Sequence, residues 1–330
     1  MKRNQKDGNK KPISEKTIVI CGASSGIGRA TALEFAGSGA SVILAARRKE
    51  VLDQLAGECL AKGARAAHAI KADVTDAEQL AAVAELAIEK TGSIDVWINN
   101  AGAGAVGEYD DIPLEIHEKV VRTNLLGHMN GTYAVLPVFK LQGYGILINT
   151  ISVGGWVPEP YAVAYTASKY GLRGFSESLR CELRHFPNIR ICDVFPAYID
   201  TPGFQHAANY IGKVLKPIPP VFPPERVAQA MLSLAVRPRS AVSVGETAPL
   251  FLFMNFISPS LMRNLNAGIM ENYFRRAQSA HITTGAILEP MNEGTGVSGG
   301  WIKPKKKPAA AFAIAAVLGL AGGLLLARKM

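Results

Sequence analysis

The stretch TIVICGASSGIG, residues 17–28, decides the fold that this sequence predicts. Thr17–Cys21 is a short apolar run typical of a strand, and an amphipathic helix is expected over about 27–38. The glycines between them let the backbone approach a pyrophosphate at the positive N-terminus of a helix. Their spacing is G-x-x-x-G-x-G, not the commoner G-x-G-x-x-G. An ordinary tight turn shows the same glycines, so their position between strand and helix is what favours a dinucleotide site.

Apolar strands alternate with amphipathic helices as far as about residue 200. The alternation predicts an α/β fold in three layers, a doubly wound parallel sheet covered by helices on both faces. Asp76 is placed to cap a helix over 77–90, a long helix is expected after Pro113, and another over 160–186. Further strands are expected at 41–45, 64–70, 94–98, 145–149, 189–195 and 241–245, the last after a helix over 223–236.

The net positive charge of the chain comes from its two ends. The formal net charge is +9. Residues 1–16 hold six basic and two acidic side chains, residues 301–330 hold six basic and none acidic, and the body between them is therefore slightly acidic. This distribution argues against a nucleic-acid surface and for ends that meet anionic lipid, although tails that merely aid solubility have the same composition. The four cysteines show no pairing or metal-like spacing, so neither a disulfide nor a metal is expected.

Residues 309–327, AAAFAIAAVLGLAGGLLLA, are uncharged and apolar. A helix of that length spans about 28 Å, close to the hydrocarbon thickness of a bilayer. We expect a transmembrane helix, with a buried core helix or an interfacial helix as alternatives. The denser basic cluster precedes it, which predicts a single-pass anchor with the folded body on the cytoplasmic side. Residues 249–277 are also apolar and are expected to be core or interface, or else a membrane-facing surface.

Three side chains form a candidate proton-transfer group. Lys169 follows Tyr165 by one helical turn, on the same helix face, and Ser152 lies 13 residues before the tyrosine. A phenol is a poor acid–base at neutral pH, and a nearby ammonium favours the phenolate and lowers its pKa. Ser152 is suited to donate a hydrogen bond to a substrate carbonyl. Without the glycine turn, the tyrosine and lysine would be an ordinary surface pair.

The end of the second strand bears on the choice of cofactor. In dinucleotide folds a carboxylate there binds the ribose of NAD, whereas an arginine accepts the 2′-phosphate of NADP. This chain has Arg47 and Arg48 and no acid at that point. An arginine can bind the phosphate through a charge-assisted fork. The sequence favours NADP (NADPH), the alternative being two solvated arginines at the start of a helix.

Together these motifs resemble the short-chain dehydrogenase/reductase (SDR) family, single-domain type, over about residues 15–245. The resemblance rests on the glycine turn, Asn99-Asn100-Ala101-Gly102, Ser152 and Tyr165-x-x-x-Lys169, in that order. It implies a Rossmann fold and a catalytic tetrad of Asn124, Ser152, Tyr165 and Lys169. It implies cofactor contacts from Gly22, Ser24, Ser25, Gly26, Ile27, Gly28, Arg47, Arg48, Asp73, Val74, Asn100, Ala101, Gly102, Tyr165, Lys169, Pro196, Ile199 and Thr201.

The chain departs from the family pattern at two positions. Cys21 stands where the family usually has Thr before the glycine turn, and Ala197 where it usually has Gly after Pro196. Neither change removes a group that carbonyl–alcohol chemistry needs. The expected organisation is a basic tail (1–15), a catalytic domain (16–284) with a substrate loop at about 200–224, a linker (285–308) and the transmembrane helix.

The resemblance implies NADP(H)-dependent interconversion of a carbonyl and an alcohol. The apolar substrate loop and the anchor favour a lipophilic substrate, such as a long-chain 3-keto lipid or sphingoid precursor, a steroid or a retinoid. Alternatives are an alcohol dehydrogenase acting on a small soluble substrate and a non-catalytic nucleotide-binding scaffold. A homodimer or homotetramer is expected by resemblance alone.

Overall fold

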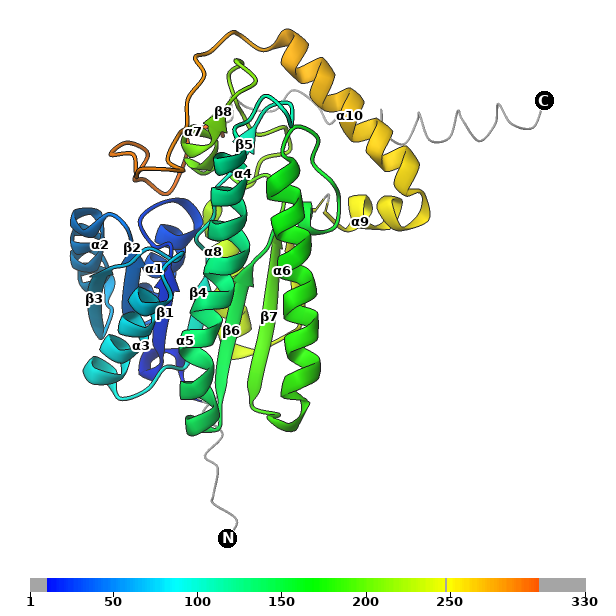
Figure 1. The fold of residues 1–330 in the computed structure, drawn as a ribbon. Helices are drawn as coiled ribbons and strands as arrows, with labels where there is room; N and C mark the ends of the chain where they lie inside the picture. Colours follow the sequence, from blue (N-terminus) through cyan, green and yellow to red (C-terminus); the bar gives the residue numbers. More distant parts are fainter. Residues whose placement is uncertain (1–10, 247, 303–330) are drawn as a thin grey trace, which may run out of the picture.

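A seven-stranded parallel sheet forms the centre of the molecule (Figure 1). The structure, a computed structural model, describes residues 11–246 and 248–302. The strand order is β3-β2-β1-β4-β6-β7-β9. The strands are β1 (Thr17–Cys21), β2 (Ser41–Ala46), β3 (Ala66–Lys71), β4 (Val96–Asn99), β6 (Gly145–Thr150), β7 (Ile189–Pro196) and β9 (Ala241–Val244). The predicted doubly wound parallel sheet is confirmed, with strand ends shifted by a residue or two.

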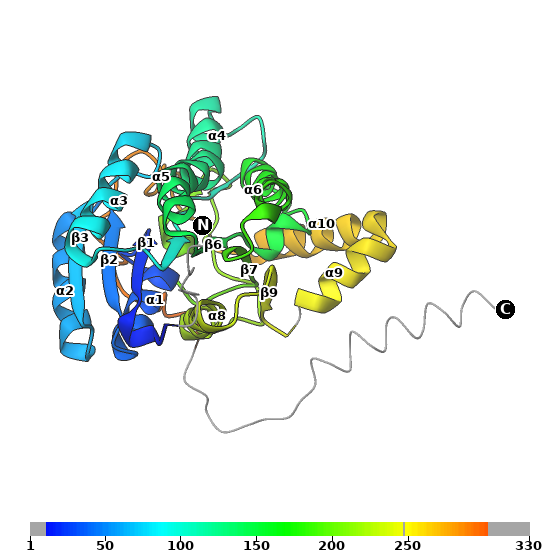
Figure 2. The same ribbon diagram turned by 90° about the horizontal axis from the view of Figure 1, so that it is seen from below.

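Helices cover both faces of the sheet (Figure 2). One face packs α1 (Gly26–Gly37), α2 (Lys49–Lys62) and α8 (Pro224–Val236) against a core that includes Phe35, Leu52 and Met231. The other face packs α3 (Ala77–Thr91), α5 (Gly127–Gln142) and α6 (Val163–Glu182) around Trp97 and Phe139. The helix α4 (Leu114–Val121) precedes α5. Strands buried on both faces explain why β1 and β2 read as continuous apolar runs.

The order of the strands reverses next to β1. β1 pairs with β2 on one side and with β4 on the other, and the connections to these two neighbours pass on opposite faces of the sheet. The loops after these strands therefore diverge and leave a crevice at the carboxyl ends, which is where open α/β sheets bind ligands. A separate two-stranded sheet, β5 (Ala105–Val106) with β8 (Ala208–Asn209), which the sequence did not indicate, lies at this same end.

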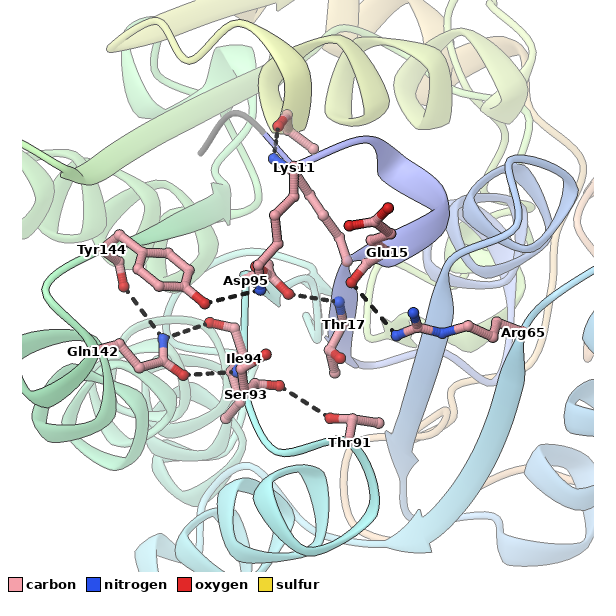
Figure 3. A network of polar contacts seen from close by, with 12 residues as sticks. Lys11, Glu15, Thr17, Arg65, Thr91, Ser93, Ile94, Asp95, Gln142 and Tyr144 are labelled. Atoms are coloured by element: carbon pink, nitrogen blue, oxygen red, sulfur yellow. Dashed lines mark hydrogen bonds and ion pairs between the residues drawn. The ribbon is translucent and has the colours of Figure 1, made fainter. Parts of the chain in front are cut away.

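The opposite end of the sheet is closed by the residues before β1 (Figure 3). Lys11 Nζ lies 2.9 Å from Asp95 Oδ1 and 3.0 Å from Tyr144 Oη, and Asp95 Oδ2 accepts from the Thr17 amide at 2.8 Å. Lys16 is buried, and its ammonium donates to the Ala235 carbonyl at 2.8 Å. Residues 11–15, which the sequence placed in a basic tail, therefore lie against the body, where Lys11 binds Asp95 and Tyr144.

Residues 249–277 fold as two helices, α9 (Ala248–Ile257) and α10 (Pro259–Arg276), which project beside β9 and α6 (Figures 1 and 2). The predicted core role holds for Met262 and Phe274, which are buried. The other side of the two helices is exposed: the side chains of Phe253 and Phe256 are 62% and 82% exposed. The pair therefore has one face toward the body and one apolar face outward.

The C-terminal segment 285–302 has no helix or strand but lies against the body, in contrast to the linker predicted for 285–308. Figure 1 shows it in orange, crossing the carboxyl end of the sheet toward α1 and α2. We call residues 285–302 the strap. The predicted transmembrane helix, 309–327, lies outside the described residues. Within 11–246 and 248–302, no helix combines the length and apolarity needed to cross a bilayer.

Candidate active site

A cavity of ≈ 590 Å³ opens at the carboxyl ends of β1, β4, β6 and β7. Of the residues that the sequence singled out for the cofactor and the chemistry, all but two line it. The exceptions are Gly28 and Asn124, which are buried behind its wall. The predicted site residues are thus brought together in one place.

The glycine turn forms one end of the cavity. Gly22 has φ +89°, and a Cβ there would lie 2.6 Å from the Ala101 nitrogen. A Cβ on Gly28 would lie 2.0 Å from the Gly22 carbonyl oxygen. Side chains at these two positions would overlap backbone, so only glycine allows the turn to close against β4. Gly28 therefore acts through packing, whereas Gly22 and Gly26 lie on the cavity wall.

The proton-transfer group lies at the other end. Ser152 follows β6 with φ +144°, a strained value for a non-glycine residue, and its Oγ accepts from the Gly154 amide at 3.0 Å. Tyr165 and Lys169 come from the first turns of α6. Lys169 Nζ donates to the Thr150 carbonyl at 3.0 Å and lies 5.7 Å from the centre of the Tyr165 ring. The three side chains face the same space in the cavity.

Burial dominates the electrostatics of this group. It raises the pKa of Tyr165 well above its ordinary value, the Glu159 carboxylate raises it further, and a hydrogen bond with Ser152 opposes the rise. Burial also lowers the pKa of Lys169 to about 7, and Glu159 opposes that shift. The lowering of the Tyr165 pKa expected from Lys169 is therefore not found among the described residues, where desolvation is the largest cause of the shift.

Asn124 lies in a π-helical turn, Arg122–Leu126, between α4 and α5. Its Oδ1 accepts from the Ala103 amide at 2.7 Å, and its Nδ2 donates to the Ala103 carbonyl at 2.9 Å and to Ser168 Oγ at 3.0 Å. A Cβ on Gly102 would lie 3.4 Å from Asn124 Oδ1 and 3.9 Å from Lys169 Nζ. Asn124 is thus close to Lys169 and fixes the loop after β4, through a widened turn of the kind often found at functional sites.

Carbonyl groups of the strap accept hydrogen bonds from several residues that the sequence assigned to cofactor binding. Arg47 donates to the Ala286 carbonyl at 2.7 Å, and Arg48 to the Met291 carbonyl at 2.8 Å and to Ser24 Oγ at 2.9 Å. The Gly26 amide, at the start of α1, donates to the Gly296 carbonyl at 2.9 Å. The strap therefore lies directly over the end of the cavity expected to hold the nucleotide phosphates.

Asp200 anchors the strap. Its carboxylate accepts from Ser298 Oγ at 2.8 Å and from the Gly299 and Trp301 amides at 3.1 and 2.8 Å. Trp301 Nε1 donates to the Thr201 carbonyl at 2.9 Å. Asp200, Glu159 and the strap carry no signal in the local sequence pattern. Asp200 binds residues about a hundred positions away, and Glu159 is brought to the cavity wall only by the fold.

The residues around the glycine turn fit an adenine dinucleotide. The turn leaves a cradle that a Cβ would fill, and the Asp73 carboxyl, on the cavity wall, is held by Thr75 through Oδ1 alone. Asn100 donates to the Gly22 carbonyl at 3.1 Å and steadies the turn from β4. Among the described residues, no cluster of His, Cys, Asp or Glu is arranged to hold a metal ion.

Comparison with known proteins identifies the family. Residues 16–210 match the family described as short chain dehydrogenase. An uncharacterized oxidoreductase of Bacillus subtilis, YxnA, is 35% identical over 265 residues, 79% of this chain and 74% of its own length. The NADP-dependent 3-hydroxy acid dehydrogenase of Schizosaccharomyces pombe is 35% identical over 245 residues, 71% and 92% of the two chains. An alcohol dehydrogenase of Thermococcus sibiricus, solved with 5-hydroxy-NADP, superposes with a TM-score of 0.61 at 26% identity, covering 69% and 95%.

Proposed function

This chain belongs to the short-chain dehydrogenase family, and from that premise we propose an NADP(H)-dependent oxidoreductase that interconverts a carbonyl and an alcohol on a lipophilic substrate. The observation that carries the proposal is the meeting of Ser152, Tyr165 and Lys169 in one cavity with the glycine turn. A bound nicotinamide cofactor would supply or accept the hydride. Everything else in the reaction depends on what these side chains do to the substrate oxygen.

The tyrosine holds the proton. Because burial keeps the pKa of Tyr165 high, its phenol is protonated before reduction and is able to donate to the developing alkoxide. Ser152 is placed beside it to bind the same oxygen, and its Oγ is oriented by the Gly154 amide. Lys169, near the tyrosine ring, supplies the positive charge that stabilises the phenolate left behind.

Preference for NADP rests on Arg47 and Arg48. Both line the cavity at the end of β2, and no carboxylate takes the position that would repel a 2′-phosphate. The relative in Schizosaccharomyces pombe is named as NADP-dependent, and the Thermococcus sibiricus structure contains an NADP derivative. Both observations support NADP for this chain.

A lipophilic substrate is supported by the wall of the cavity farthest from the glycine turn. From the predicted substrate loop at about 200–224, Phe204, Ile218, Pro219 and Pro220 line the cavity, while Ile211 and Leu215 pack toward Phe274. The helical pair α9–α10 adds four apolar side chains to this wall: Phe251, Met262, Ile269 and Met270.

The outward face of the same helices supports a location at a membrane. Phe253, Phe256, Ile257 and Leu261 are exposed on α9 and at the start of α10, so the helices that line the cavity also present apolar side chains to the surroundings. With the apolar sequence at 309–327, this supports a protein held at the cytoplasmic side of a bilayer by one C-terminal span. A homodimer or homotetramer belongs to the same proposal, by family resemblance.

The test is oxidation of NADPH by the full-length protein in detergent, with ketones graded from short and polar to long-chain. NADH and Tyr165→Phe serve as comparisons. We expect turnover that rises with chain length, favours NADPH, and falls by at least about 100-fold in the variant, because general acid catalysis contributes that much. Turnover confined to short ketones would contradict the lipophilic substrate, and bound cofactor without turnover on any of them would favour a scaffold.

A further inference from the structure

A carboxylate that belongs to neither the cofactor cradle nor the proton-transfer group lies in the cavity. Glu159 precedes α6, and its backbone is held by Thr166, whose Oγ1 accepts from the Glu159 amide at 3.0 Å. A Cβ built on Gly154 would lie 2.7 Å from Glu159 Oε1 and 3.2 Å from Tyr165 Cε1. The carboxyl group and the edge of the tyrosine ring therefore border the same small space.

This carboxyl group has no partner of its own. Within residues 11–246 and 248–302, no hydrogen bond or ion pair reaches its oxygens. Burial raises the pKa of Glu159 to about 7, opposed by the charge of Lys169, whose ammonium is itself bonded to the Thr150 carbonyl. The other ionisable groups it acts upon, Tyr165 and Tyr198, are neutral phenols. The side chain is half-buried on the cavity wall, so a ligand in the cavity can reach the carboxylate and provide the partner that the surrounding residues do not.

We propose that Glu159 binds an ammonium group carried by the substrate close to its reacting carbon, so that the substrate class is an amino ketone, or its amino alcohol, with an apolar chain. The inference rests on the proposed function and adds the chemistry of the substrate's polar end. The oxygen of such a molecule lies at Tyr165 and Ser152, its ammonium at Glu159, and its chain along the apolar wall of Met262, Ile269 and Met270.

A cation is favoured over a neutral hydroxyl for an electrostatic reason. A hydroxyl would satisfy one lone pair of the carboxylate but leave its charge opposed by Lys169 alone, whose ammonium already donates to the Thr150 carbonyl. An ammonium satisfies both, and hydrogen bonds between charged groups are about twice as strong as neutral ones. The expected preference is about 10- to 100-fold, the range that one charge-assisted hydrogen bond supports.

The experiment compares three long-chain ketones that differ only at the carbon beside the carbonyl: amino, hydroxy and unsubstituted. The quantity measured is the ratio of kcat/KM for the amino ketone to that for the unsubstituted ketone. We expect a ratio of about 10 to 100 in the wild-type protein, a smaller one for the hydroxy ketone, and a ratio near one in Glu159→Gln. Glutamine keeps the shape and the backbone bond to Thr166, and Glu118→Gln, at an exposed position of α4, is the matched control.

The ratio of kcat/KM between the amino and the unsubstituted ketone distinguishes binding of an ammonium by Glu159 from other roles of this residue. If Glu159 only shaped the loop or acted on Tyr165, Glu159→Gln would change all three ketones together and leave the ratio unchanged, which would overturn the proposal. The same ratio is measured for binding of the matched amino and unsubstituted alcohols by calorimetry with NADP⁺ present. If no ketone is turned over, the proposed function fails, while a binding ratio that depends on Glu159 still supports the ammonium site and an invariant one refutes it.

Discussion

Replacing Asp200 by alanine should release the strap while leaving the sheet intact. The carboxylate accepts three hydrogen bonds of 3.1 Å or less from Ser298, Gly299 and Trp301 and a longer one, 3.4 Å, from the Ile302 amide, and Asp200 itself is 4% exposed. Hydrogen bonds to charged groups contribute about 1.5–3 kcal/mol each when buried. Since the strap side of these bonds is only half-buried, we take about 1–1.5 kcal/mol for each of the three shorter bonds, or about 3–4.5 kcal/mol for local opening.

Amide hydrogen exchange measures that opening directly. A loss of about 3–4.5 kcal/mol corresponds to an exchange of the Gly299 and Trp301 amides that is about 100- to 2,000-fold faster, at about 1.4 kcal/mol per factor of ten. Asp200→Asn keeps one acceptor oxygen and should show an intermediate change. Amides of β1 and β4 serve as the internal control and should keep their protection. Strap exchange within threefold of wild type in Asp200→Ala would refute the assignment of Asp200 as the anchor.

Three further outcomes are expected. Gly28→Ala should lower the melting temperature by several degrees and abolish NADPH binding, because its methyl group would lie 2.0 Å from a backbone oxygen; Gly57→Ala, where nothing lies within 4 Å, is the control, and equal effects would contradict the packing argument. Arg47→Ala should raise KM for NADPH about 10-fold or more with little change for NADH, and a parallel rise for both would remove its phosphate role. His128, whose pKa burial lowers to about 3 from 6.5, is uncharged when folded, so the unfolded state binds more protons between these values. Stability should therefore fall as the pH drops below about 6.5, by up to about 1.4 kcal/mol per pH unit, in denaturant titrations; His128→Asn should flatten that slope and His185→Asn should not.

The sequence predicted the parts of this molecule that depend on local pattern. Alternating apolar runs and amphipathic helices located the sheet strands, and Asp76 caps α3 as expected, accepting from the Glu78 and Gln79 amides. The glycine turn and the spacing of Tyr165 and Lys169 located the cavity. In an open α/β sheet the ligand crevice lies at the carboxyl ends of the strands, and the glycine turn follows the carboxyl end of β1.

The remainder depends on contacts between residues far apart in the chain. Lys11 looked like part of a basic tail because only the fold brings Asp95 to it. The strap looked like a linker because glycine- and proline-rich composition predicts the absence of helix and strand, not the absence of contacts. Glu159 carried no signal at all: a carboxylate between two prolines is ordinary until the fold places it on the cavity wall beside Tyr165.

The strap also bears on chemical selectivity. The family match ends at residue 210, so one wall of the nucleotide end of the cavity comes from a segment outside the residues that match the family. An inhibitor built only for the glycine turn would meet the same backbone in many relatives. One extended between Arg48 and the Met291 carbonyl, or into the contact between Gly26 and Gly296, would compete with a contact supplied by this chain's own C-terminal sequence, and that is where discrimination among relatives is to be sought.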